Sequence, residues 1–351
     1  MHLAARIVAT LLWAAVAAQA AQVARSPLPW LIGPLLATAL AGIAGAPVAA
    51  SLRLRNAGQW AIGVALGLYF TPPVVRQLGP LAPYIGVGIA WALGLGWCFH
   101  RFLRRFNPGE SAATTFFAAA IGGASEMAVL ADRHGARIDR VAAAHSLRLM
   151  LVVLCLPLAF QWAGLHGVAV AAPASLQVHA GGLLALTAAT LAGVALMRRL
   201  ALPNPWVLGA LAVTMALSAS GLALSALPRE ATNVGQLFIG VALGARFTPE
   251  FARAAPRWLA SVALGSLGMI SLSAAFGALL GTAAGLHPAT GVLATAPGGI
   301  AEMCITAKVL QLGVPVVTAF HVLRYLAVLL FTAALFRWEQ RRLSAPGPSA
   351  P

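Results

Sequence analysis

Acidic side chains are scarce in this sequence: Asp and Glu together number 8 among 351 residues, and charged residues of all kinds make up only 9%. Soluble proteins carry about 25% charged residues, so the composition excludes an ordinary soluble domain. Hydrophobic residues instead reach 60%, with a mean hydropathy of +0.86. Apolar runs recur from end to end, and about 20 residues of helix cross the hydrocarbon layer of a bilayer. The sequence therefore predicts an all-α polytopic membrane protein.

Cysteine is also rare, and recognisable motifs for catalysis are missing. Cys98, Cys155 and Cys304 each sit inside an apolar run, which argues against a disulfide or metal framework. No Ser/His/Asp set, phosphate loop or metal-ligand spacing stands out. We therefore expect a protein that is not an enzyme and that has no cofactor and no metal site.

Basic residues outnumber acidic ones and give a formal net charge of +15. They occur singly or in small groups in the short gaps between apolar runs, which is typical of residues that set membrane topology. No basic soluble segment is present, so we expect no nucleic-acid partner. The main groups are Arg53 and Arg55; Arg101, Arg104 and Arg105; Arg198 and Arg199; and Arg341 and Arg342.

Short gaps with Pro, Gly or Arg divide the chain into apolar segments, and we expect about 10–12 transmembrane segments. The first set falls at 3–24, 29–46, 57–70, 80–100, 111–131 and 141–163, and the second at 179–197, 204–224, 234–247, 257–285, 289–308 and 314–336. The start of the chain could pass for a signal peptide, but its counterpart at 179–197 cannot, so both are interpreted as helices.

The second half of the chain repeats the first, including polar residues inside apolar stretches. The block at 58–72 reappears at 235–249, and Gly-Gly-x-x-Glu-Met at 122–127 reappears at 298–303. We therefore expect two homologous repeats. The predicted division is 1–165 for the first membrane repeat, 166–178 for a linker, 179–336 for the second repeat and 337–351 for a disordered charged and Pro-rich tail.

Two segments in each half are too irregular for a simple spanning helix. The segments 57–70 and 234–247 are short and end in Phe-Thr-Pro, where proline stops a helix. The segments 111–131 and 289–308 carry a Gly-Gly pair in mid-run. Matching interruptions in two halves are the best sequence pointer to a transporter's binding site. Six crossings per half would make the repeats parallel, whereas five would make them inverted, and the sequence leaves both open.

Glu126 and Glu302 are acidic residues inside apolar runs, each three residues after Gly-Gly. Arg148 and Arg324 also lie inside runs, each with a histidine three positions earlier that shares its helix face. A charge at the bilayer centre costs about 2.5–3.5 kcal/mol, so these residues need partners or a function.

Two interpretations of these charges remain open. In the structural one, Glu126 pairs with Arg148 and Glu302 pairs with Arg324. In the functional one, the glutamates couple protons or cations, and the arginines and freed glycine amides bind an anion. The glutamines that open the short segments are explained either by capping and interhelical bonding or by binding. The candidate substrate- or ion-binding residues are Glu126, Glu302, Arg148, Arg324, His145, His321, Gly122, Gly123, Gly298, Gly299, Gln59 and Gln236.

Four short patterns, each present in both halves, resemble the AbrB-type family of integral membrane proteins, which is defined by an internal duplication. They are Pro-Trp-x-x-Gly at 29–33 and 205–209, Gly-Gln-x-x-Ile-Gly at 58–63 and 235–240, the Gly-Gly-x-x-Glu-Met blocks, and His-x-x-Arg at 145–148 and 321–324. Some family members are named aidB regulators and others ammonia monooxygenases. The resemblance implies a multi-pass bacterial inner-membrane protein, similar in organisation to the cation/proton antiporter and bile-acid symporter folds. Copper or oxygen chemistry would need clustered ligands, which the sequence does not offer.

The favoured hypothesis is a secondary transporter of a small anionic or zwitterionic organic solute, coupled to H⁺ or Na⁺, with its site at the repeat interface. The alternative is a membrane-embedded regulator that affects gene expression indirectly and moves nothing. The expected partners are the lipid bilayer, the solute and the coupling ion, and a homodimer is allowed.

Overall fold

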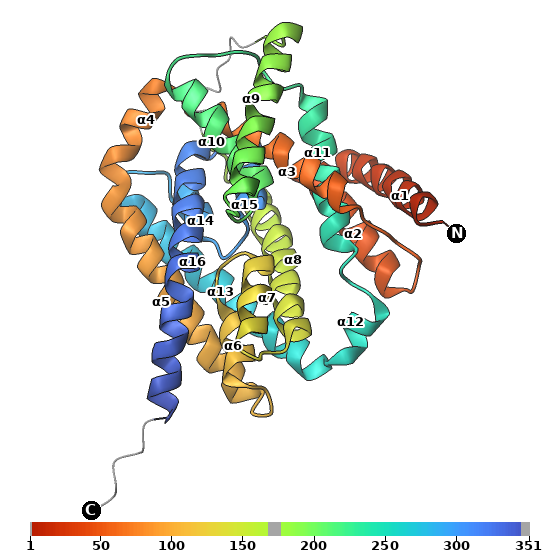
Figure 1. Ribbon diagram of the computed structural model, residues 1–351, viewed down its shortest axis with the longest axis vertical. Helices are drawn as coiled ribbons and strands as arrows, with labels where there is room; N and C mark the ends of the chain where they lie inside the picture. The colour runs from red at the N-terminus through yellow and green to blue at the C-terminus, as the bar shows by residue number, and fades with distance from the viewer. Residues whose placement is uncertain (1, 168–176, 345–351) are drawn as a thin grey trace, which may run out of the picture.

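The computed structural model describes residues 2–167 and 177–344, and every regular element in these ranges is a helix (Figure 1). The first half contains α1 (Leu3–Val23), α2 (Pro29–Ile43), α3 (Leu52–Gly67), α4 (Pro72–Leu78), the 3₁₀ helix η1 (Gly79–Leu81), α5 (Ala82–Phe106), α6 (Ala112–Ala119), α7 (Ala124–Arg133) and α8 (Ile138–Trp162). The second half contains α9 (Ala180–Arg199), α10 (Pro205–Ala219), α11 (Arg229–Gly244), α12 (Pro249–Ala254), α13 (Pro256–Ala283), α14 (Pro288–Thr295), α15 (Ile300–Val309) and α16 (Val314–Ser344).

The class predicted from the sequence, an all-α polytopic membrane protein, is confirmed. Within the described ranges, six helices are long and apolar enough to cross a membrane, namely α1, α5 together with α4 and η1, α8, α9, α13 and α16. The same order of long, short and broken helices occurs in both halves, and the division into repeats remains an interpretation of the sequence. Helix α16 continues to Ser344, past the expected end at 336. Most of the predicted linker, and the tail from 345, lie outside the described residues.

The Phe-Thr-Pro triplets have a different role from the one expected. Helices α3 and α11 each have 16 residues and end at glycine, at Gly67 and Gly244, before the triplet is reached. The prolines then begin new short helices, α4 and α12, because proline is well tolerated in the first turn of a helix. In α12 the Thr248 hydroxyl caps the start by accepting a hydrogen bond of 3.2 Å from the Phe251 amide.

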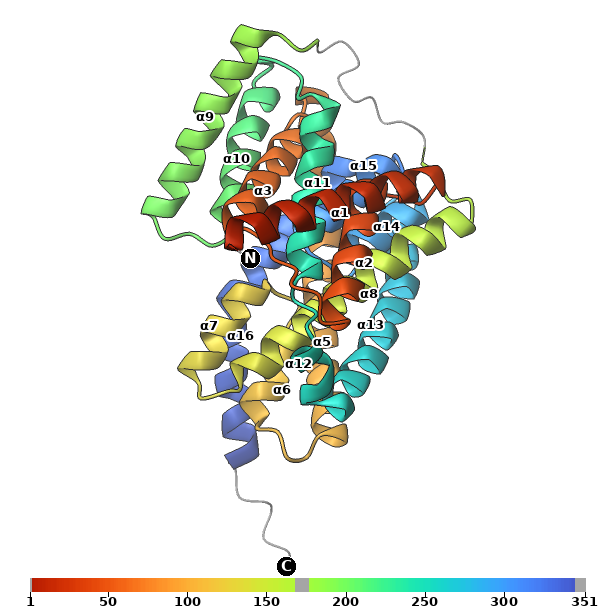
Figure 2. The same ribbon diagram turned by 90° about the vertical axis from the view of Figure 1, so that its right-hand side faces the viewer.

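The helices form two bundles, which Figures 1 and 2 show from two sides. The scaffold bundle consists of α1, α2, α3, α9, α10 and α11, and the broken-helix bundle consists of α5 to α8 and α13 to α16. Few helix pairs connect them: α3 approaches α15 and α16, and α2 approaches α8. The two breaks differ in burial: the second, around Gly298 and Gly299, is buried except at Gly299, whereas the first, around Gly122 and Gly123, is half-buried and runs into an exposed Ser125.

In the scaffold bundle, helices from the first half of the chain pack on helices from the second half. Helix α3 packs on α10 and α2 packs on α11, and glycines bring the backbones together. A Cβ on Gly63 would collide with the Val207 carbonyl oxygen, and one on Gly240 would collide with that of Leu31. Helices α3 and α11 also cross where Gly58 meets Gly235. Small residues at such crossings are the usual way for helices to associate in lipid, where contact replaces the hydrophobic effect.

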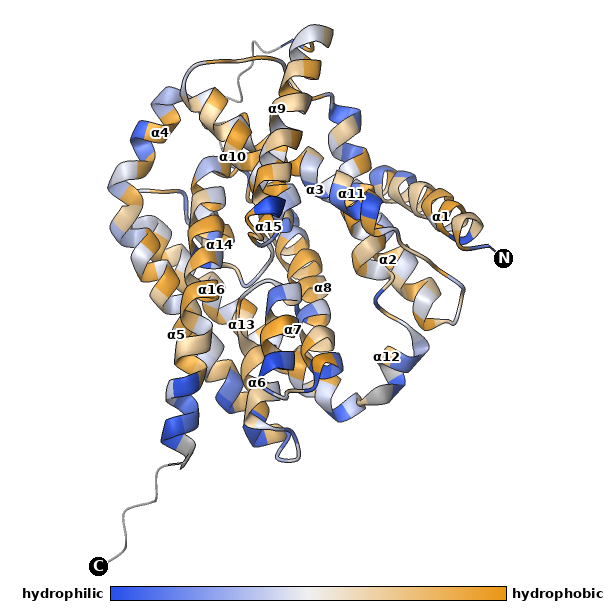
Figure 3. Cartoon of the chain, in the orientation of Figure 1, coloured by the Kyte–Doolittle hydropathy of each residue, from blue (hydrophilic) through white to orange (hydrophobic). Residues whose placement is uncertain are grey.

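One end of the broken-helix bundle is rich in arginine. The ends of α5, α8, α13 and α16 meet there: Trp258 Nε1 donates to the Arg140 carbonyl at 3.2 Å, and Arg257 Nε donates to that of Phe106 at 3.1 Å. Figure 3 shows hydrophilic residues gathered at this end of α16 and around α6 and α7. Within the described ranges its eleven arginines are Arg101, Arg104, Arg105, Arg133, Arg137, Arg140, Arg253, Arg257, Arg337, Arg341 and Arg342.

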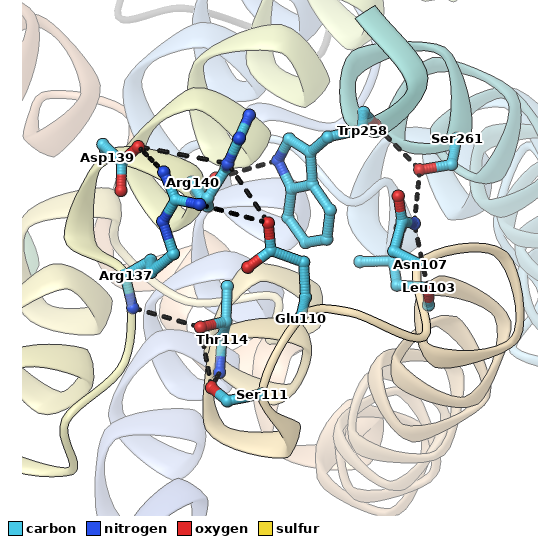
Figure 4. Close-up of polar contacts among 10 residues, drawn as sticks. All are labelled: Leu103, Asn107, Glu110, Ser111, Thr114, Arg137, Asp139, Arg140, Trp258 and Ser261. Carbon is cyan, nitrogen blue, oxygen red and sulfur yellow. Dashed lines mark hydrogen bonds and ion pairs between the residues drawn. The ribbon is translucent and has the colours of Figure 1, made fainter. Parts of the chain in front are cut away.

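Ion pairs hold part of this end together (Figure 4). Arg140 Nε lies 3.2 Å from Oε1 of Glu110, and Arg137 lies 2.9 Å from the Asp139 carboxylate, which raises the pKa of the Arg137 guanidinium. Glu339, which the sequence placed in a disordered tail, is instead fully buried in α16, with its Oε1 3.7 Å from Arg101 Nη1. The carboxylate thus joins the parallel ends of α5 and α16.

The arginine-rich end predicts the orientation of the chain. The opposite ends of α5, α8, α13 and α16 have no Lys or Arg in the adjoining turn. Because Lys and Arg accumulate in cytoplasmic loops, we expect the C-terminus to be cytoplasmic. A fluorescent protein fused to the C-terminus should fluoresce, and alkaline phosphatase fused after Gly285, beyond α13, should be active. The reverse pattern would contradict this orientation.

Candidate functional site

A polar cavity of about 290 Å³ lies between the two bundles. The N-terminal ends of the half-helices α7 and α15 open into it from the broken-helix bundle, and α3, α10 and α11 form its other wall. Eight of the twelve sequence-predicted site residues line the cavity: Gln59, Gly122, Gly123, Glu126, Gly298, Gly299, Glu302 and Arg324. The other four, Arg148, His145, His321 and Gln236, lie buried outside its wall.

The Gly-Gly pairs mark the breaks in the two interrupted helices, as expected. Helix α6 ends at Ala119 and α7 begins at Ala124, and α14 ends at Thr295 before α15 begins at Ile300. Each break leaves carbonyls without helical partners at the end of one half-helix and amides without helical partners at the start of the next. In an apolar environment these groups must be satisfied by protein.

The two glutamates occupy the amide ends. Gly123 and Gly299 are the N-cap residues, so Glu126 and Glu302 stand at the third position of their half-helices. Each carboxylate folds back over its N-cap glycine, where a Cβ would collide with the glutamate Oε2. The Glu302 carboxylate also accepts a hydrogen bond from its own backbone amide. A carboxylate here is favoured by the positive end of the helix dipole, and the second glycine of each pair leaves room for it.

Arg148 and His145 occupy the carbonyl end of α6. Arg148 Nη2 donates to the Ala120 carbonyl at 3.0 Å, and Nη1 lies 3.4 Å from the Ala119 carbonyl and 3.5 Å from that of Ala118. His145 Nε2 donates to the Phe117 carbonyl at 2.9 Å. These two side chains therefore reach four successive carbonyls at the negative end of a half-helix.

Arg324 and His321 do the same for α14. Arg324 donates to the Ala296 carbonyl, and its Nη2 donates to the Gly298 carbonyl at 2.7 Å. His321 Nε2 donates to the Leu293 carbonyl at 2.8 Å. In both pairs the arginine Nη2 also donates to the histidine Nδ1, so the histidine carries its proton on Nε2 and is neutral.

The structural interpretation, in which Glu126 pairs with Arg148 and Glu302 pairs with Arg324, is therefore wrong. Within the described ranges neither pair approaches to 4.0 Å. The reason is that the two charges serve opposite ends of the broken helices: the guanidinium groups bind carbonyls and the carboxylates face amides.

Two cavity arginines were missed by sequence reasoning. Arg55 was interpreted as a loop charge and Arg246 was not singled out, yet both line the cavity and both are close enough to interact electrostatically with Glu302. Arg246 Nη1 also donates to the Ser146 hydroxyl at 3.2 Å. The signal was present in the repeats, because the equivalent positions of the other half hold Thr232 and Tyr69. A charge found in one copy of a duplicated segment indicates a position where the halves differ in role.

The cavity wall combines positive charge with an unsatisfied donor. It contains the guanidinium groups of Arg55, Arg246 and Arg324 and two carboxylates, together with Asn56 and Asn204. Within the described part of the chain, Arg324 Nε is a buried donor of this wall that has no hydrogen-bond partner, whereas the Tyr325 phenol faces the Glu126 carboxylate. Among the same residues, no group of three His, Cys, Asp or Glu side chains is placed to hold a metal ion.

The capping role of Arg148 is testable by substitution. Arg148→Leu leaves the carbonyls of residues 118–120 without this partner, and each unsatisfied buried group costs about 1–3 kcal/mol. Because three carbonyls lose this partner, we expect the free energy of unfolding in lipid–detergent micelles to fall by about 3 kcal/mol or more. The matched control is Arg133→Leu, which removes an exposed arginine of α7. Equal stability of the two variants would refute the capping role.

The chain matches a known protein family and a known relative. The family model described as "Transition state regulatory protein AbrB" matches residues 30–340. The chain is also similar to the "Uncharacterized protein YhjN" of Bacillus subtilis (strain 168), with 25% identity over 296 residues, which are 80% of this chain and 77% of the relative. No solved structure matches. Because the match covers both interrupted helices and the cavity between them, the chain belongs to the AbrB family.

Proposed function

We propose that this protein is a secondary transporter of a small anionic or zwitterionic organic solute, driven by H⁺ or Na⁺ and bound in the cavity between the bundles. The observation that carries the proposal is the convergence of two half-helix N-termini on one polar cavity. Broken helices that present their N-termini near the midplane are how many transporters bind anionic groups.

The size and charge of the cavity support a small anion. Ligand pockets usually span about 300–1,000 Å³, so a cavity of about 290 Å³ fits a solute of few atoms. Three guanidinium groups face two carboxylates in its wall, which leaves an excess of positive charge. Arginine is suited to bind carboxylates because it presents two parallel donors. A carboxylate on the solute is the group that this wall would recognise best.

The arrangement of the bundles supports movement of the solute. The cavity lies between the scaffold bundle and the broken-helix bundle, and few helix pairs join them. Alternating access requires one bundle to rock or slide against the other around such a site. Glu126 and Glu302 provide carboxylates that H⁺ or Na⁺ could neutralise during the cycle, and this is the proposed basis of coupling.

Counterflow of labelled metabolites in proteoliposomes tests the proposal. Arg55→Gln and Arg246→Gln each remove a cavity guanidinium that caps no helix. Loss of one hydrogen bond to a charged group costs about 1.5–3 kcal/mol, so we expect the apparent affinity to fall about tenfold or more. Arg53→Gln, an exposed position in the same helix as Arg55, is the control and should transport normally. Unchanged counterflow in both cavity variants would show that the solute binds elsewhere.

The same experiment addresses the regulatory alternative, which the name of the family favours. A sensor would bind the solute in the cavity but would not exchange it across the bilayer. Thermal stabilisation of the purified protein by a metabolite, without counterflow of that metabolite, is the expected result for a sensor. We place the protein in a bacterial inner membrane, with the solute, the coupling ion and the bilayer as its partners.

A further inference from the structure

We infer that the Glu302 carboxylate is a tethered competitor of the solute: it occupies the N-terminus of α15 in this state, and the carboxylate of the solute displaces it. Glu126 holds the equivalent place on α7. This inference rests on the proposed function, because it identifies the group that the solute must replace.

The first observation is that the anion position of each half-helix is already filled by the protein. Glu302 and Glu126 stand at the third helical position, and their Oε2 atoms lie where a Cβ of Gly299 or Gly123 would be. An oxygen in that place is next to the free amides of the first turn. A second carboxylate cannot use these amides until the glutamate leaves.

The second observation is that the cavity wall holds a donor that the protein does not use. Arg324 is 5% exposed, and within the described residues its Nε has no hydrogen-bond partner. Arg324 lines the same cavity as the two glutamates. Buried donors are rarely left unsatisfied in native proteins, so this one indicates a bound group with an acceptor oxygen.

The third observation is a place for the displaced side chain. Arg55 of α3 and Arg246, just beyond α11, both line the cavity and interact electrostatically with Glu302. The glutamate can therefore leave the helix end and remain opposite a positive charge. On the other half, Thr232 and Tyr69 stand where these two arginines would be repeated, so Glu126 has no equivalent pair. This difference selects Glu302 as the residue that moves.

The exchange replaces one carboxylate by another at the same amides. The helix end always carries an anion, so the cost of an empty, buried N-terminus is avoided. Glu302 faces Arg55, Arg246 and the thiol of Cys304, and Glu126 faces the phenol of Tyr325. The solute must displace the Glu302 carboxylate before it binds. Its measured affinity is therefore weaker than its affinity for the same helix end without the glutamate.

Acetate is a suitable probe, because it carries the carboxylate alone. Its binding to the purified full-length protein is measured by calorimetry and by the shift of the unfolding temperature. Glu302→Gln removes the charge of the competitor, and Glu302→Asp keeps the charge but shortens the side chain by one methylene. Displacement predicts that acetate binds at least about fivefold more tightly to both variants, since a shorter side chain holds the N-cap less well. Glu230→Gln, a first-turn glutamate of α11 outside the cavity wall, is the control and should match the wild type.

Three results would overturn the inference. Tighter binding to Glu302→Gln with unchanged binding to Glu302→Asp would mean that only the overall charge of the cavity matters. Weaker binding to both would make Glu302 a ligand of the solute instead of its competitor. Acetate binding to none of the proteins would show that no carboxylate enters. Glu302→Asp decides the test if Glu302→Gln fails to fold. Each of these results leaves counterflow of a solute through the wild-type protein unaffected, so the proposed function is tested separately.

Discussion

The structure depends on one constraint: a helix interrupted inside an apolar bundle exposes backbone groups that neither lipid nor hydrocarbon side chains can satisfy. Each break here creates a carbonyl end and an amide end within a few residues. An arginine and a histidine from the following long helix bind the carbonyls, and a glutamate one turn into the new half-helix faces the amides. The partial charges at the broken helix ends thus stabilise the four intramembrane charges, which would be costly in lipid without partners.

This constraint also explains the spacing of the motifs. Gly-Gly-x-x-Glu places the carboxylate at the third helical position and removes the side chain that would block it. His-x-x-Arg puts two donors on one face of a helix, so that they reach successive carbonyls of a neighbour. The amide ends, each with its glutamate, both open into one cavity, and this is the basis of the proposed solute site.

The sequence was sufficient for the class of protein, the positions of the two breaks and the set of intramembrane charges, because these follow from hydropathy and from residues that helices tolerate poorly. It was not sufficient for the partners of the charges. Spacing gives the face of a helix but not the element opposite, and Arg148 reaches back to Ala120 across an intervening half-helix and loop. Arg55 was misread because its place near the start of α3 resembles a loop, whereas tertiary packing of α3 on the opposite half brings it to the cavity.

The packing of α2 and α3 on helices of the second half has a consequence for the synthesis and folding of the chain. Helix α3 packs mainly on α10 and α11, and Gly58 meets Gly235 directly, so the surface that α3 needs is synthesised more than 140 residues later. During translation the first half enters the bilayer with the polar start of α3 unmatched, and it stays so until the second half emerges from the ribosome. The packing of α3 is therefore completed only after the second half of the chain has been synthesised.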